Sequence, residues 1–254
     1  MNGRPTTVGV LGGMGPTATV DFIQRVIDAT DADRDQDHLR LLVDSDPSVP
    51  DRSAFLAGRG PSPVDHLVRM ARGLEQAGAT LLVIPCNTAH VWLGEIASSV
   101  DIEVVDWVGE VVRHIGSLDD GPRFVGLLAT TGTVSARLYQ DTFRDSGVSI
   151  ALPTAAGQAS LMEVIYGPAG IKASSAAVAA PVVRELLHEV TAELIDAGVD
   201  SLLLACTELS VAHAVLADAG VPVFDATQIV AEAVVVRAGK RLSTERGRGV
   251  EERC

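Results

Sequence analysis

Two cysteines, Cys86 and Cys206, stand at equivalent places in the chain. Each follows a short aliphatic run, LLVIP before Cys86 and LLLA before Cys206, and each precedes polar residues, NTAH and TELS. A thiol has an ordinary pKa of about 8.5, which cationic neighbours can lower until thiol and thiolate coexist near neutral pH. Two such groups can remove a proton from one face of a carbon atom and supply one to the other face. The pair therefore predicts a proton-transfer site.

Four further side chains could take part in this chemistry. His90 and Glu208 follow the two cysteines closely and are candidate proton partners. Arg52, in SDPSVPDRSAF, and Lys172, in IYGPAGIKAS, are cations in separate loops. Either cation alone would be typical of a surface loop, but two of them suit the two ends of a dicarboxylic amino acid.

The chain contains an internal repeat that would position these residues. A shift of 117 brings residues 8–11 onto 125–128, in two units of strand, glycine or threonine loop, and helix. A shift of 120 brings the segment before Cys86 onto the segment before Cys206. The two shifts agree within three residues, which indicates two related halves with the cysteines in register.

Strands alternate with helical patterns throughout the chain. Besides the strands of the repeat, we expect strands over 39–45, 103–107, 149–154 and 222–227. Such alternation predicts parallel sheets with helical crossovers, and ligands of these sheets bind beyond the carboxyl ends of the strands. We therefore predict an α/β fold of two pseudo-symmetric domains with the active site in the cleft between them. The first domain would comprise residues 1–107 plus 214–254, and the second residues 108–213.

Composition argues against several classes of protein. The net charge of −13 argues against nucleic-acid binding, which needs a basic surface. Apolar runs are far shorter than the ~20 residues of a membrane span, and no signal-peptide pattern is present, so we expect no membrane contact and a cytoplasmic location. With 47% hydrophobic but 4% aromatic residues, the core should be aliphatic. Three cysteines, an odd number, argue against a disulfide framework, and Cys254 is not expected to take part.

At this point the motifs as a set resemble a known family. GGMGPTAT, PDR, PCNTAH, IYGPAGIKA and ACTEL occur in this order between about residues 7 and 235. In this combination the chain resembles the aspartate racemases of the aspartate/glutamate racemase superfamily. The resemblance implies a PLP-independent isomerase that interconverts the L- and D-enantiomers of an acidic amino acid, aspartate or glutamate. It also implies that the enzyme needs no cofactor or metal and is often a homodimer.

The resemblance also implies roles for individual residues. Cys86 and Cys206 would be the acid/base pair, and Arg52 and Lys172 would bind the substrate carboxylates. The other residues expected to line the site are Met14, Thr17, Asn87, Thr88, Thr130, Thr133 and Thr207. Cell-wall glutamate racemases carry an Asp-Ser pair after the first strand and a histidine after the second Cys-Thr. Here Gly13-Met14 and Glu208 stand at those places, which favours the aspartate branch and leaves the substrate open.

Other functions remain as alternatives. A hydantoin racemase, a maleate isomerase and a malonate decarboxylase belong to the same superfamily, and a non-catalytic two-lobed binding protein would also fit the architecture. Two intact cysteines favour proton transfer at both faces over decarboxylation, and the two cations favour an acidic substrate over a hydantoin. A PLP enzyme is disfavoured because Lys172 is the only plausible Schiff-base lysine. The GVLGGMG segment does not fit a dinucleotide-binding loop.

Overall fold

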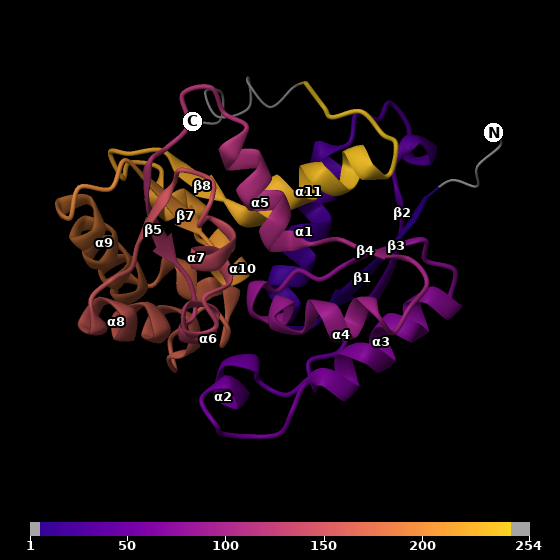
Figure 1. Ribbon diagram of the computed structural model, residues 1–254, viewed down its shortest axis with the longest axis horizontal. Coiled ribbons are helices and arrows are strands. Elements are labelled where there is room, and N and C mark those ends of the chain that lie inside the picture. Colours follow the sequence, from indigo (N-terminus) through magenta and orange to yellow (C-terminus); the bar gives the residue numbers. More distant parts are fainter. Residues whose placement is uncertain (1–5, 245–254) are drawn as a thin grey trace.

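Two parallel β-sheets form the framework of the molecule in the computed structural model, which describes residues 6–244 (Figure 1). The first sheet has the order β2 (Arg40–Ser45), β1 (Thr7–Gly12), β3 (Leu81–Val83), β4 (Glu103–Val104). The second has the order β6 (Ser149–Ala151), β5 (Phe124–Leu128), β7 (Ser201–Leu204), β8 (Val223–Asp225). All neighbouring strands are parallel. The second sheet repeats the order of the first, which confirms the predicted α/β fold with two pseudo-symmetric halves.

Helices connect the strands, as parallel pairing requires. The first half, around β1–β4, contains α1 (Pro16–Ala29), α2 (Arg52–Leu56), α3 (Val64–Gln76) and α4 (Leu93–Ala97), with 3-10 turns η1 (Asp35–Asp37) and η2 (Asn87–Trp92). Helix α5 (Trp107–Gly116) leads to the second half. That half, around β5–β8, contains α6 (Thr131–Ser135), α7 (Leu138–Thr142), α8 (Ala155–Tyr166), α9 (Pro181–Asp196) and α10 (Thr207–Val211), with η3 (Ser175–Ala179) and η4 (His213–Leu216). The last helix is α11 (Ala226–Arg237).

Three strands are shorter than the sequence predicted, because a helix-capping residue follows each of them. These are the strands expected over 103–107, 149–154 and 222–227, which end at Val104, Ala151 and Asp225. Asp106, Thr154 and Asp225 each accept a hydrogen bond from a backbone N–H in the first turn of the following helix. Such side chains are strong N-caps, so the chain turns into α5, α8 and α11 where the apolar pattern alone suggested continued strand.

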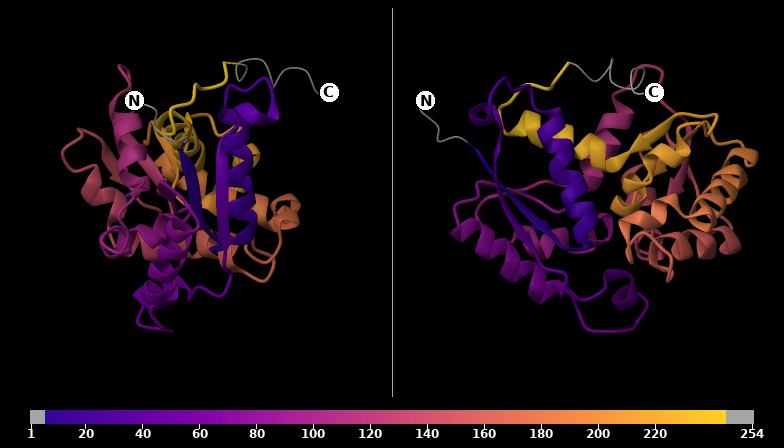
Figure 2. Two further views of the ribbon diagram at one scale, coloured as in Figure 1. Left: turned by 90° about the vertical axis from the view of Figure 1, so that its right-hand side faces the viewer. Right: turned by 180° about the vertical axis from the view of Figure 1, so that it is seen from behind.

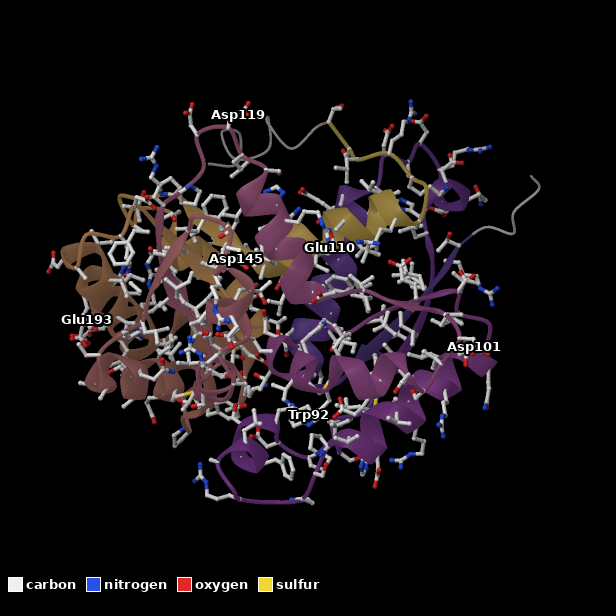
Figure 3. All side chains as sticks on the ribbon, in the orientation of Figure 1. Trp92, Asp101, Glu110, Asp119, Asp145 and Glu193 are labelled. Atoms are coloured by element: carbon white, nitrogen blue, oxygen red, sulfur yellow. The ribbon has the colours of Figure 1, made fainter. Side chains whose placement is uncertain are left out.

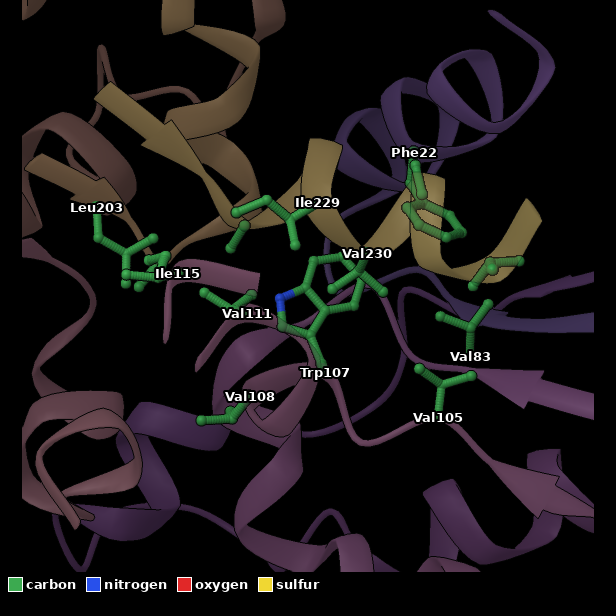
Figure 4. Packing of buried hydrophobic residues seen from close by; sticks show 14 of the residues in the cluster. Phe22, Val83, Val105, Trp107, Val108, Val111, Ile115, Leu203, Ile229 and Val230 are labelled. Carbon is green, nitrogen blue, oxygen red and sulfur yellow. The ribbon is translucent and has the colours of Figure 1, made fainter. Parts of the chain in front are cut away.

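The largest hydrophobic cluster lies between the two sheets, where α1, α5 and α11 pack together. Trp107 of α5 is fully buried, and its ring centroid lies 5.6 Å from that of Phe22 on α1. Figure 4 shows Trp107 surrounded by Val111, Val105 and Val230. Because strand residues of both sheets join this cluster, the packing holds the two halves together at the end of the molecule where α11 runs.

The predicted domain boundaries stay a prediction, but the structure shows where the chain crosses between halves. Within 214–254, β8 pairs with β7 of the second sheet. The next helix, α11, packs against α1 of the first half, as Figure 2 shows from behind. The crossing therefore follows β8. Cys254 lies outside the described residues.

Asp101, Asp119 and Glu193 lie at the edge of the molecule in Figure 3. Asp101 and Asp119 are exposed. In residues 6–244 no helix is both long and apolar enough to cross a membrane.

Candidate active site

Cys86 and Cys206 line one small cavity between the two halves. Cys86 follows β3 of the first sheet and Cys206 follows β7 of the second, both beyond the carboxyl ends of their strands. Both are buried, with exposed fractions of 6% and 5%. The cavity has a volume of about 10 Å³, and it is lined by Met14, Arg52, Cys86, Asn87, Thr88, Thr130, Tyr166, Lys172, Cys206, Thr207 and Glu208. The structure thus brings both cysteines together with most of the residues predicted around them.

Cys206 is held as a thiol by Glu208. The thiol donates a hydrogen bond to Oε2 of Glu208, with a distance of 3.2 Å between Sγ and Oε2. Burial raises the pKa of Cys206, and the negative charge of Glu208 raises it further, although Lys172 acts in the opposite direction. Cys206 is therefore protonated at neutral pH, and this is the form that can supply a proton to a carbon atom.

Glu208 and the partly buried Lys172 form an ion pair beside this thiol. Oε1 of Glu208 accepts hydrogen bonds from Lys172 Nζ at 2.6 Å and from the backbone N–H of Gly15 at 3.0 Å. Burial alone would raise the pKa of Glu208, but Lys172 and the hydrogen bonds outweigh burial and lower it. Burial alone would lower the pKa of Lys172, but Glu208 outweighs burial and raises it. Each charge thus compensates the burial of the other.

Arg52, by contrast, is a buried cation without a carboxylate partner. It is 6% exposed. Its Nη atoms donate to three backbone carbonyl oxygens, those of Met14, Val49 and Pro50. Within residues 6–244 no carboxylate forms an ion pair with Arg52, and its Nε has no hydrogen-bond partner. Burial alone would lower the pKa of Arg52, but Cys86, Tyr166 and the carboxylate of Asp51, with which it forms no ion pair, outweigh burial and raise it. The guanidinium cation therefore favours negative charge on a ligand bound beside it.

The ion pair also forms one wall of the cavity. Lys172 Nζ donates to the carbonyl oxygen of Met14 at 3.0 Å, so it joins the second half to the loop before α1. A neighbouring pocket on the outer side is lined by Gly15, Pro16, Thr17, Ala18, Ile171, Lys172, Glu208 and Val211. Since Lys172 and Glu208 line both spaces, they separate the inner cavity from the outer pocket.

On another side of the cavity, hydrogen bonds between three threonine hydroxyls join the two halves. Thr88, in η2 of the first half, lies 3.0 Å from Thr130 and 2.9 Å from Thr133, measured between Oγ1 atoms. Thr130 also caps α6 by accepting from the backbone N–H of Thr133. Thr88 and Thr130 line the cavity, whereas Thr133 is fully buried behind them.

Two other predicted residues lie away from the cavity. Thr17 is exposed in the first turn of α1 and lines the outer pocket. His90 is buried, and its Nδ1 lies 2.9 Å from the backbone carbonyl oxygen of Cys86. Burial lowers the pKa of His90, so the ring is neutral at pH 7. His90 thus contacts the backbone of Cys86, whereas Glu208 contacts the thiol of Cys206.

Sequence reasoning missed Tyr166, the last residue of α8, which lines the cavity. Lys172 Nζ lies 5.3 Å from the centroid of its ring. Tyr166 stands in the same IYGPAGIKA motif as Lys172, and a tyrosine beside a glycine-rich loop was the available signal.

No group of three or more His, Cys, Asp or Glu side chains in the described part of the chain is placed to hold a metal ion.

Comparison with known proteins bears on this site. The model of the Asp/Glu/Hydantoin racemase family matches residues 11–234, a range that includes every residue lining the cavity. The chain belongs to this family. It is 27% identical over 242 residues to the broad specificity amino-acid racemase RacX of Bacillus subtilis, covering 90% of this chain and 96% of that protein.

Solved structures of racemases share the fold. The Picrophilus torridus aspartate racemase is 32% identical, with a TM-score of 0.82 and coverage of 94% of this chain and 97% of that chain. A glutamate racemase from Francisella tularensis, solved in complex with D-glutamate, is 15% identical, with a TM-score of 0.65 and coverage of 95% and 84%. These findings confirm the resemblance predicted from the motifs and support an isomerase that acts on a small amino-acid substrate.

Proposed function

We propose that this racemase-family chain interconverts the L- and D-enantiomers of an acidic amino acid, aspartate or glutamate, by a two-base mechanism. The observation that carries the proposal is that Cys86 and Cys206, from equivalent strand ends of the two halves, line the same buried cavity. A substrate held between them would present one face of its Cα to each sulfur.

The two sulfurs have neighbours of opposite charge. Arg52 lies beside Cys86, whereas Glu208 accepts a hydrogen bond from the Cys206 thiol. In one direction the Cys86 thiolate would take the Cα proton, and the Cys206 thiol would transfer its proton to the opposite face. In the other direction the two sulfurs exchange roles. Each turnover then leaves the proton on the opposite cysteine, and no cofactor is required for the proton balance.

Two buried N–H donors of the cavity support an anionic substrate. Arg52 Nε and Asn87 Nδ2 have no hydrogen-bond partner within residues 6–244. Unpartnered buried donors are costly, and a carboxylate supplies acceptors for both. We assign the α-carboxylate to this side and the side-chain carboxylate to Lys172. A hydantoin carries no carboxylate, so these donors favour an amino acid over a hydantoin.

The cavity must open to admit such a substrate. Its volume of about 10 Å³ holds about one water molecule. The structure therefore corresponds to a closed arrangement, and separation of the two halves would precede binding. Closure would then exclude water and bring both sulfurs to the substrate.

The decisive experiment is incubation of the protein in D₂O without PLP, with L-aspartate, L-glutamate, L-alanine and a 5-substituted hydantoin. We expect loss of the α-proton signal and appearance of the D-enantiomer for an acidic amino acid. Turnover of the hydantoin alone would favour that alternative instead.

Cysteine variants test the mechanism. Cys86→Ala and Cys206→Ala should each abolish racemisation, because both proton transfers are needed. Each variant can still exchange the α-proton of one enantiomer through its remaining thiol, and the two variants should act on opposite enantiomers. Cys254→Ala is the matched control and should racemise at the wild-type rate. Near wild-type racemisation by either active-site variant would refute the mechanism.

The predicted homodimer and cytoplasmic location stay predictions.

A further inference from the structure

Glu208 uses its two carboxylate oxygens for two different partners. Oε1 accepts from Lys172 Nζ at 2.6 Å, and Oε2 accepts from Cys206 Sγ at 3.2 Å. All three side chains are largely removed from solvent. Lys172 is also the cation to which we assign the side-chain carboxylate of the substrate. A dicarboxylic substrate and Glu208 would therefore compete for one ammonium group.

We propose that the side-chain carboxylate of an acidic substrate activates Cys206: by drawing Lys172 away from Glu208, it enables Glu208 to accept the proton of the Cys206 thiol. The inference rests on the proposed function and adds a specificity-determining role for Glu208. In this step the S–H bond of Cys206 breaks and an O–H bond forms at Oε2 of Glu208. The electron pair stays on sulfur, and the resulting thiolate is the base for one enantiomer.

The direction of the effect follows from the contacts of Lys172. Lys172 acts on Glu208 through both its charge and a hydrogen bond, but on Cys206 through its charge alone. Loss of Lys172 therefore raises the proton affinity of Glu208 more than that of Cys206. An adjacent cation changes the pKa of a carboxylate by about 1–3, which is about a 10- to 1000-fold change in proton affinity. Proton transfer from Cys206 to Glu208 becomes easier by up to that factor.

A neutral substrate leaves the ion pair in place. Asparagine has nearly the shape of aspartate but no second carboxylate, so Glu208 keeps Lys172 and remains a weak base. If Lys172 served only to bind aspartate, the preference for aspartate would appear in KM. If the substrate carboxylate activates Cys206 as proposed, the preference for aspartate should instead appear in the rate at saturating substrate.

The test compares aspartate with asparagine in the Cys86→Ala variant, where Cys206 is the remaining base. The measurement is α-proton exchange in D₂O at saturating substrate. We expect aspartate to exchange about 10- to 1000-fold faster than asparagine, and the added substitution Glu208→Gln to remove this advantage. Cys206→Ala is the matched control, because its exchange runs through Cys86. In that variant the exchange rate of aspartate relative to that of asparagine should be the same with and without Glu208→Gln.

A second measurement covers the case in which Cys86→Ala does not fold. In that case the racemisation kcat for aspartate is divided by the kcat for asparagine in the enzyme with both cysteines. Glu208→Gln should lower this ratio of kcat values by reducing kcat for aspartate. Wild-type protein that racemises aspartate, with a ratio unchanged by Glu208→Gln, would overturn the inference and leave the racemase intact. Wild-type protein that racemises no acidic amino acid would overturn the proposed function itself.

Discussion

Arg52→Lys tests the proposed carboxylate site most directly, because the substitution keeps the charge and removes the planar fork. The Nη atoms of Arg52 are occupied by backbone carbonyls, and Nε is the N–H group without a partner in the described residues. A lysine ammonium cannot hold those carbonyls and also present a donor at the position of Nε. One hydrogen bond to the substrate carboxylate should therefore be lost.

The magnitude follows from that single contact. A hydrogen bond to a charged group contributes about 1.5–3 kcal/mol, and about 1.36 kcal/mol corresponds to a factor of ten, so kcat/KM for aspartate should fall about 10- to 160-fold. The loss should appear in both directions, because both enantiomers carry the α-carboxylate.

The assay is the initial rate of formation of the opposite enantiomer, measured by chiral chromatography at several aspartate concentrations. Arg113→Lys is the matched control, because Arg113 on α5 pairs with Glu110 and its side chain is 59% exposed. Thermal unfolding followed by circular dichroism verifies that both variants fold. A folded Arg52→Lys variant with wild-type kcat/KM would remove Arg52 from the site and reopen the neutral substrates.

Two further predictions concern the contacts between the halves, and a third concerns the ion pair within the second half. Thr133→Val leaves a buried hydroxyl partner unsatisfied and should lower the free energy of unfolding in urea by about 1–3 kcal/mol; a change below about 0.5 kcal/mol would contradict the packing. Gly132→Ala places a Cβ 2.7 Å from Ser53 Oγ across the interface and should reduce kcat/KM by hindering closure, so unchanged kinetics would argue against closure at this contact. Because the folded pKa of Glu208 lies below its ordinary value of 4.5, the stability from its pair with Lys172 is present above pH 4.5 and lost as pH falls through the folded value. In the Glu208→Gln variant the melting temperature should therefore fall less steeply as the pH is lowered below 4.5. The same steepness in the variant and the wild type would disprove this linkage.

Much of the framework was predictable from the sequence because parallel strands bury both faces and leave continuous aliphatic runs. The repeat placed β3 and β7 at equivalent positions, and Cys86 and Cys206 follow these strands directly. Since carboxyl ends of parallel strands form one edge of a sheet, their convergence on a cleft could be inferred. Strand ends were less predictable, because a capping residue such as Asp106 competes locally with the apolar pattern.

The residue types at the site and their register were thus determined by the sequence alone, whereas the pairing of the charges was decided by the tertiary structure. Arg52 and Lys172 read alike in the sequence, as single cations in loops. In the fold Lys172 meets Glu208, 36 residues away, and Arg52 meets backbone carbonyls without a carboxylate. Long side chains reach several possible partners, so which charge each one meets depends on how distant loops pack against each other. The same reason explains why Tyr166 entered the cavity unpredicted, whereas His90 makes a local contact with the backbone of Cys86, four residues before it.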